Sequence, residues 1–225
     1  MRNSRGSSSR RLTAAFACAL VATTVQCGNP QPPAGEPAPR FTSSVEPVDA
    51  ARLGASWHPG CPVAPDRLRL LRLSHVGVDG QERTGELVVH EDRVRQTVDA
   101  FARLHALRFP IERMRPAGDY PGAEDETSMR ANNTSAFNCR GISGSGSWSQ
   151  HAYGRAVDVN PLRNPYLSSE GDLQPATAGP YLDRTRRDPG MLHDGDAAVR
   201  MFTDAGWTWG GSWHDPKDYQ HFELP

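Results

Sequence analysis

The sequence predicts an α+β domain in which a small sheet carries a metal site and helices pack on the other face of that sheet. Three observations lead to this prediction. Short strand-like segments are separated by turn residues, one longer segment has helical periodicity, and two segments in the C-terminal part of the chain combine His with Asp. At 225 residues, with 37% hydrophobic residues and a formal net charge of -1, the chain has room for one domain plus extensions.

The scaffold is predicted from its first strands and its helix. Residues 67–78 and 85–90 have strand patterns and are expected to form a loose hairpin. A helix is expected from Asp92 until Pro110 ends the pattern. The apolar side chains that recur with helical spacing, and that we expect to face the core, are Val94, Val98, Phe101, Leu104 and Leu107.

The segments after this helix are predicted as short elements and loops. Residues 111–114 predict a strand, and residues 118–133 are polar and turn-rich, which is typical of a loop bordering a cleft. Residues 163–190 predict a long loop that is either a substrate-binding lid or a surface insertion. A short helix that ends at Gly206 then leads into residues 207–213, a strand that runs into a tight aromatic turn.

Two segments bring together residue types that bind metal ions. His151 and Asp158 lie seven positions apart in SQHAYGRAVDVNP, with residues 155–159 predicted as a strand, and His221 follows Asp218 by three positions in DYQHFE. Two imidazole nitrogens and one carboxylate oxygen suit Zn²⁺ and leave its fourth tetrahedral position for water, as in catalytic zinc sites. The sequence therefore predicts a zinc site made of His151, Asp158 and His221.

Asp218 is left over as a carboxylate close to the expected metal. A zinc hydrolase needs such a group to take a proton from water and deliver it to the leaving amine. His214 lies in the same segment and is a rival ligand or a group that lines the pocket. The remaining histidines are expected to be core or surface residues: His58, His75, His90, His105 and His193.

These residues resemble a known family. The pattern SxHxxGxAxD from Ser149 to Asp158, with the later D-x-x-H, is similar to the D-alanyl-D-alanine carboxypeptidase and dipeptidase family of zinc peptidases, in the group that includes lysostaphin and the hedgehog signalling domain. The likeness covers about residues 67–225 and is close to the branch of L-alanyl-D-glutamate endopeptidases. Further segments that carry it are RFPIERM (108–114), NNTSAFNCR (132–140), NPY (164–166) and GWTWGGSW (206–213).

The resemblance implies a mostly antiparallel sheet and a role for each matching residue. His151, Asp158 and His221 correspond to the zinc ligands, and Asp218 corresponds to the general base. Relatives use an upstream arginine to stabilise the oxyanion, for which Arg140 is the candidate and Arg130 the alternative. The residues expected to bind substrate are Ser149, Trp209 and His214.

The N-terminal segments predict export. Residues 1–27 combine arginines with an apolar run that is too short to span a bilayer, which is typical of a signal peptide. Cys27 follows this run where a lipoprotein would carry its lipid anchor, although Gln26 departs from the usual pattern, so lipidation and plain secretion both stay open. Residues 28–45 form a Pro-rich linker, and residues 46–225 form the expected peptidase domain. Loss of the four arginines before Cys27 would change the formal charge from -1 to -5.

Two cysteines remain in the exported domain, Cys61 and Cys139. In an oxidising compartment they are expected to pair, and free thiols are the alternative. The sequence has no CxxC motif, which argues against a cysteine zinc site.

Together these observations predict an exported zinc metallopeptidase that hydrolyses peptidoglycan stem or cross-bridge peptides outside the cell, in the cell wall or lipid-anchored to the outer face of the membrane. The alternative is a zinc-stabilised module that binds cell wall without catalysis. The absence of a sustained basic patch argues against nucleic-acid binding. D,D-carboxypeptidase and L-Ala-D-Glu endopeptidase activities both fit, because they use the same metal chemistry.

Overall fold

The structure describes residues 40–142 and 144–225, and a three-stranded antiparallel sheet lies near the start of this part of the chain. In this computed structural model β1 (Ser43–Pro47) pairs with β2 (Leu68–Val76), which pairs with β3 (Glu82–His90). The hairpin predicted from the sequence is confirmed, while β1 begins within the range expected for the linker. The predicted signal peptide, Cys27 and most of the linker lie outside the described residues.

Strand β2 is covered on both faces because its apolar residues do not all point the same way. Leu71 and Leu73 join the main core, whereas Leu68 and Leu70 join a smaller cluster with Phe137. The period of two along a strand accounts for this division. The sheet thus has one face toward α2 and the other toward the segment that leads into the site.

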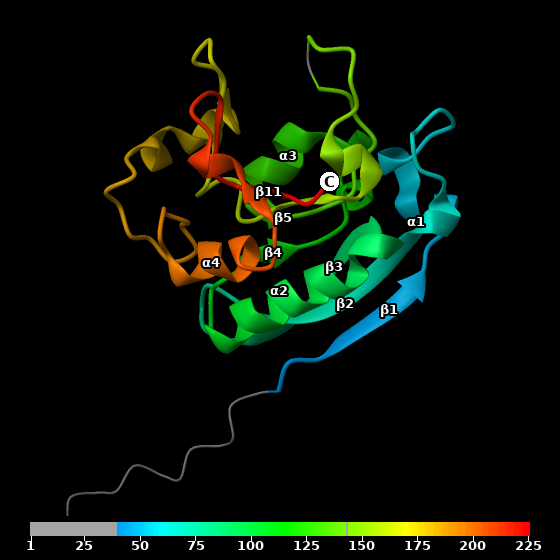
Figure 1. Ribbon diagram of the computed structural model, residues 1–225, viewed down its shortest axis with the longest axis horizontal. Coiled ribbons are helices and arrows are strands. Elements are labelled where there is room, and N and C mark those ends of the chain that lie inside the picture. The colour runs from blue at the N-terminus through cyan, green and yellow to red at the C-terminus, as the bar shows by residue number, and fades with distance from the viewer. Residues whose placement is uncertain (1–39, 143) are drawn as a thin grey trace, which may run out of the picture. The chain divides into compact units, whose positions relative to one another are not determined.

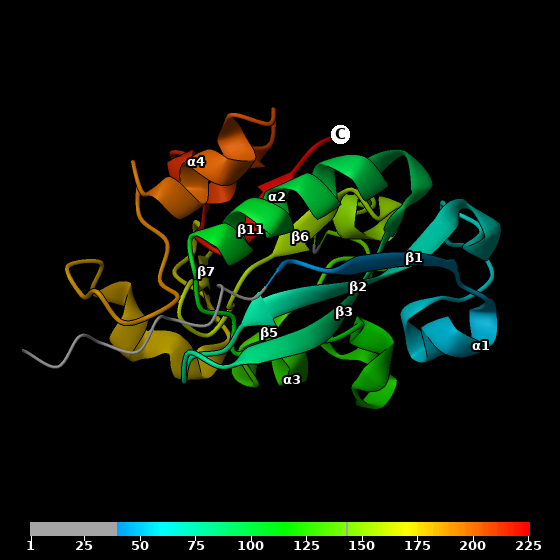
Figure 2. The ribbon, with the colours of Figure 1, turned by 90° about the horizontal axis from the view of Figure 1, so that it is seen from below.

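Helix α2 (Val94–Ala106) lies along this sheet (Figures 1 and 2). Ala100, Phe101 and Leu104 are its fully buried apolar residues, as helical spacing predicts. The expectation for Leu107 is wrong, because this residue is 44% exposed just after the last helical turn.

A second antiparallel sheet carries two of the three predicted ligands, Asp158 and His221. It has the order β6 (Ala156–Asp158), β11 (His221–Glu223) and β9 (Thr208–Trp209). On its apolar face, Phe222 stacks on Phe202 of α4 (Ala197–Thr203) with ring centroids 4.1 Å apart. Helix α4 lies beside α2 (Figure 2), so both helices cover this face of the sheet.

The two segments expected to be loops contain regular elements. Residues 118–133 include α3 (Asp125–Arg130), and residues 163–190 include β7 (Tyr166–Leu167) and β8 (Leu173–Gln174). Strand β7 also pairs with β10 (Lys217–Asp218), so part of the predicted long loop becomes a sheet beside the site.

The remaining elements are short. Helix α1 (Ala50–Leu53) follows β1, and β4 (Arg113–Met114) pairs in parallel with β5 (Asn133–Thr134). The 3₁₀ helices are Gly54–Ser56, Pro65–Arg67, Glu91–Arg93, Ala117–Asp119, Pro121–Ala123, Gln150–Tyr153, Ala176–Leu182 and Gly210–Ser212.

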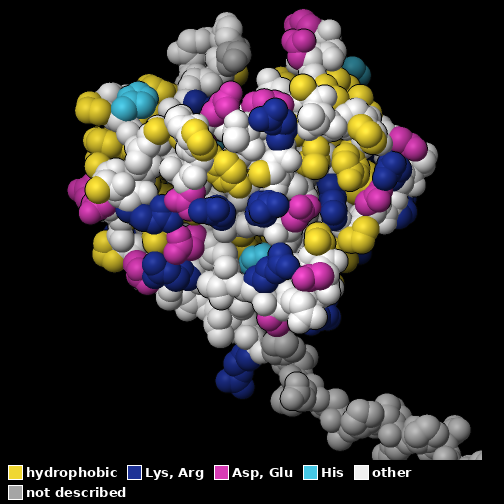
Figure 3. Space-filling view, turned by 180° about the vertical axis from the view of Figure 1, so that it is seen from behind, with side chains coloured by type: hydrophobic (Ala, Val, Ile, Leu, Met, Phe, Trp, Pro, Cys, Tyr) yellow, Lys and Arg dark blue, Asp and Glu magenta, His cyan; other side chains and the backbone are white. Residues whose placement is uncertain are grey.

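The predicted fold class is confirmed: the domain is α+β with several small, mostly antiparallel sheets. In the described part of the chain, none of the helices has the length and apolar character needed to cross a membrane. The face shown in Figure 3 carries Lys and Arg side chains interspersed with Asp and Glu.

Candidate metal centre

Strands β6 and β11 bring the three predicted ligands together. Their antiparallel register sets His221 directly opposite Asp158. His151 comes from the 3₁₀ helix before β6, which ends at Gly154 in the left-handed conformation (φ 66°). A Cβ atom at Gly154 would lie 2.6 Å from the backbone nitrogen of His90, so this turn packs directly on the end of β3.

The inner atoms of the three side chains face one another. His151 Nε2 lies 3.2 Å from Asp158 Oδ2 and 3.2 Å from His221 Nδ1, and His221 Nδ1 lies 3.1 Å from Asp158 Oδ1. All three residues are buried, and a donor atom from each falls within 4.8 Å of the others. Zinc bonds of about 2.0–2.1 Å at tetrahedral angles would set donor atoms about 3.3 Å apart, so this group fits such an ion.

The outer nitrogen of each imidazole is engaged away from this centre. His151 Nδ1 donates to the carbonyl oxygen of Ala136 at 2.6 Å, and His221 Nε2 donates to the Glu223 carboxylate at 3.2 Å. A proton on each outer nitrogen leaves the inner lone pair free for a metal ion.

The charges of Asp158 and of the two histidines, His151 and His221, stabilise one another. Burial disfavours the charged form of Asp158, but the charges and hydrogen bonds of His151 and His221 outweigh it and lower the pKa of Asp158. Burial also lowers the pKa of His221, whereas hydrogen bonds to Asp158 and Glu223 raise it to about 10. A metal ion and a proton compete for His221 Nδ1, so metal affinity will fall as the pH falls.

Asp218 lies in the same cavity as the three ligands. Its Oδ1 atom is buried and has no hydrogen-bond partner among the described residues. Burial raises the pKa of Asp218 to about 6, with a smaller contribution from the charge of Asp158. Asp218 therefore has an oxygen available for another group and a pKa close to neutrality.

The cavity has a volume of about 410 Å³, and Arg140 is the Lys or Arg side chain in its described wall. Asp125 forms an ion pair with Arg140 and also accepts a hydrogen bond from Asn138 Nδ2 at 2.6 Å. The alternative arginine, Arg130, is exposed at the end of α3 and does not contribute to the described wall. This arrangement favours Arg140 over Arg130.

The three residues expected to bind substrate occupy different places. Ser149 lines the cavity, and its hydroxyl accepts a hydrogen bond from the backbone nitrogen of His151 at 3.3 Å. Trp209 is buried in the main core, where its Nε1 donates to the Tyr219 carbonyl oxygen, and His214 is exposed. The structure does not support substrate contacts by Trp209 or His214, because neither lines the cavity in the described residues.

Several residues of the cavity were not predicted from the sequence. Trp213 lines it with its ring centroid 5.6 Å from that of His221, and Trp148 and Tyr166 lie in the wall. Glu223 also lines the cavity while it contacts His221. The sequence does contain a signal for Glu223. It follows His221 by two positions, and residues two apart on a strand point to the same face of the sheet.

The predicted disulfide between Cys61 and Cys139 is present, with Cα atoms 5.8 Å apart. It links the segment after α1 to the residue before Arg140. His58 lies beside it, with Nε2 3.6 Å from Cys139 Sγ.

A buried group of two imidazoles and a carboxylate, with a separate, half-buried carboxylate in the same cavity, has the composition of a metallohydrolase centre. Residues 143–224 match the family model described as D-alanyl-D-alanine carboxypeptidase. The resemblance seen in the sequence is therefore confirmed for this segment, which contains all three candidate ligands and Asp218. Comparisons with curated proteins and with solved structures gave no match.

Proposed function

We propose that this protein is an exported zinc metallopeptidase that hydrolyses peptide bonds in the stem or cross-bridge peptides of peptidoglycan. The observation that carries the proposal is the position of Asp218. It provides a carboxylate with a buried, unpaired oxygen in the cavity that also contains His151, Asp158 and His221. A centre that served only to stabilise the fold would not need this additional carboxylate.

Each residue has a role that follows from its chemistry. A bound zinc ion would supply Lewis-acid chemistry, lowering the pKa of water and polarising the scissile carbonyl. Asp218 takes a proton from the attacking water and delivers it to the amine that leaves. Arg140 donates hydrogen bonds to the negative charge that develops on the carbonyl oxygen, while Asp125 holds the guanidinium in place.

The wall of the cavity supports a peptide as the substrate. Trp148 and Trp213 offer apolar surface, while Ser149 and Gln150 offer groups that can hydrogen-bond a peptide backbone. Both carboxypeptidase and endopeptidase cleavage are compatible with this wall.

Export is supported by the disulfide, since such bonds persist in oxidising compartments. The expected signal peptide would direct this export, with Cys27 as the site of a lipid anchor if the chain is lipidated.

Mass spectrometry of purified peptidoglycan fragments after incubation with the zinc-loaded protein tests the proposal. We expect fragments to be cleaved and the cleavage to stop in a parallel sample treated with chelator. The mass of the released group identifies the bond. Stoichiometric zinc without any altered fragment would contradict the enzyme and favour the cell-wall binding module, which retention on intact cell walls would then detect.

A further inference from the structure

Glu223 lies where it can control the orientation of a candidate metal ligand. It is two residues after His221 on β11, so both side chains lie on the same face of the strand. The residue opposite Glu223 on β6 is Ala156, which is fully buried and has only a methyl side chain. This small neighbour leaves room for the Glu223 carboxylate to turn back and accept the hydrogen bond from His221 Nε2.

The two imidazoles are held in different ways. For His151 the acceptor on the outer nitrogen is a backbone carbonyl, that of Ala136, and the fold itself fixes its position. For His221 the acceptor is the side chain of Glu223. The orientation of His221 therefore depends on a group that a single substitution can change.

Glu223 is not engaged in another ion pair within the described residues. Its carboxylate contacts His221, and no Lys or Arg in the described part of the chain pairs with it. Its side chain is 24% exposed, so water alone does not fully hydrate the carboxylate. The contact with His221 is thus the interaction in the structure that gives this carboxylate its position.

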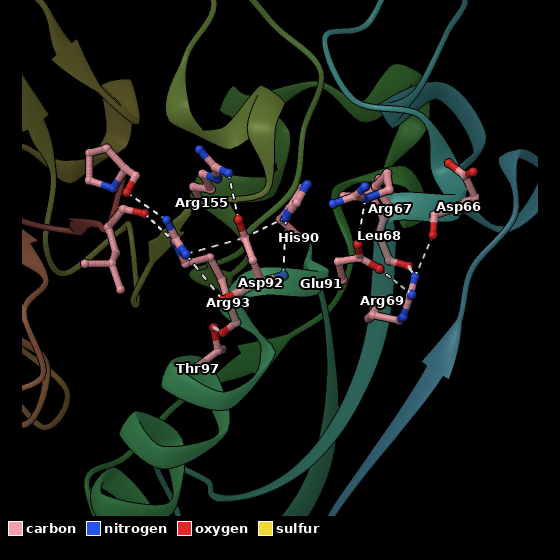
Figure 4. Close-up of polar contacts among 12 residues, drawn as sticks. Asp66, Arg67, Leu68, Arg69, His90, Glu91, Asp92, Arg93, Thr97 and Arg155 are labelled. Carbon is pink, nitrogen blue, oxygen red and sulfur yellow. Dashed lines mark hydrogen bonds and ion pairs between the residues drawn. The ribbon is translucent and has the colours of Figure 1, made fainter.

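The backbone that follows Glu223 is anchored by three hydrogen bonds. The nitrogen of Leu224 donates to the Arg155 carbonyl oxygen at 3.0 Å, and Arg93 donates from Nε to the Leu224 oxygen and from a terminal nitrogen to the Pro225 oxygen, both at 2.7 Å. Figure 4 shows Arg93 next to Asp92, which also contacts Arg155. Arg93, directly before α2, therefore holds the chain that follows Glu223.

We propose that Glu223 is a positioning residue that fixes the imidazole of His221 with Nδ1 toward the metal. The inference rests on the proposed zinc site. Carboxylates that hydrogen-bond the outer nitrogen of a metal-binding histidine fix its tautomer and ring orientation, and their loss typically weakens metal affinity by about 10–100-fold.

Two substitutions separate the effect of the hydrogen bond to His221 from the effects of the charge and size of the Glu223 side chain. In Glu223→Gln the amide oxygen can still accept from His221 Nε2, although the charge is lost. In Glu223→Met a side chain of similar length fills the space but offers almost no acceptor. Glu91→Ala is the matched control, because Glu91 pairs with Arg67 and Arg69 away from the site (Figure 4).

The first measurement is zinc affinity of the full chain, by competition with a chromophoric chelator. We expect Glu223→Met to bind zinc about 10–100-fold more weakly than the wild type, Glu223→Gln to recover most of the loss, and Glu91→Ala to bind normally. The visible spectrum of the Co²⁺-loaded proteins is the second readout. It should change in Glu223→Met, because the field of the His221 ligand changes, while the unfolding temperature of the metal-free variant stays close to that of the wild type.

Each other outcome overturns an identifiable claim. Equal zinc affinity in all four proteins, or an equal loss in the Gln and Met variants, would overturn the positioning role of Glu223. A wild-type protein that binds neither zinc nor Co²⁺ would instead overturn the zinc site of the proposed function.

Discussion

Asp218 combines burial, an unpaired oxygen and a raised pKa, and each property suits a proton carrier. We expect Asp218→Asn to keep its zinc content, because Asp218 is not one of the three candidate ligands, and to lose about 100-fold or more in kcat. Metal analysis and fragment cleavage on the same preparation check both parts. Full activity in this variant would remove Asp218 from the mechanism.

The raised pKa of Asp218 also predicts how activity depends on pH. A general base must be charged, so kcat/KM should fall as the pH drops through the pKa of Asp218, which burial raises to about 6. A bound divalent cation favours the charged form and lowers this pKa. In a profile of kcat/KM against pH, measured at saturating zinc, the rise in activity should therefore be centred at or below about pH 6. A rise centred above pH 8 would mean that a different group is the general base.

The orientation of a side chain could be predicted from the sequence where it follows from the alternation of residues along a strand. Asp158 and His221 face the site because Val157 and Phe222, their neighbours on the strands, face the core. Trp209 is opposite Phe222 on the neighbouring strand and shares its core face, and the 3₁₀ helix Gly210–Ser212 then breaks the alternation. Trp209 therefore lies in the core, while Trp213 reaches the cavity.

The turn before β6 is the element on which the presentation of His151 depends. In Gly154→Ala the new methyl group would meet backbone atoms of β3, at 2.6 Å from the His90 nitrogen, in addition to the strain of a positive φ. We expect the free energy of unfolding to fall by about 2–4 kcal/mol, together with weaker zinc binding. Denaturant unfolding of the metal-free and zinc-loaded protein measures both.

Gly80→Ala is the matched control for this substitution. Gly80 also has a positive φ, but a Cβ atom there meets no other atom within 4 Å. It should lose only about 1–2 kcal/mol, the cost of the left-handed conformation. An equal loss in both variants would mean that the contact between the turn and β3 contributes nothing.

Elements with a long repeated pattern were predictable, and very short ones were not. The periodicity of α2 runs over 13 residues, and the β2–β3 hairpin over nine paired positions. Helix α3 has six residues, of which only Ser128 and Met129 are buried, so it has no apolar stripe that could be recognised. Strands β7 and β10 pair through two residues each. These strands form because each meets a partner that is distant in the sequence, so their own composition does not predict them.

At the scale of the whole molecule, the disulfide links parts of the chain that are 78 residues apart. In the chain-entropy treatment, closing a loop of this length stabilises the folded state by up to about 4 kcal/mol. We expect the Cys61→Ser, Cys139→Ser double variant to unfold at a clearly lower denaturant concentration, with up to this loss. Comparison with the reduced wild-type protein checks the result, and unchanged stability in both would show that the reduced chain retains equivalent structure.

The disulfide and the candidate metal centre also have a topological relation. The covalent loop runs from Cys61 to Cys139, and a metal held by Asp158 and His221 would close a separate loop of 63 residues after it. The two cross-links follow one another along the chain and neither encloses the other. The disulfide restricts the unfolded polypeptide, whereas a metal ion that binds the folded site stabilises the folded state by mass action, so the two contributions are separate. A reductant and a chelator should therefore lower the free energy of unfolding by independent amounts, so that the loss with both together equals the sum of the two separate losses.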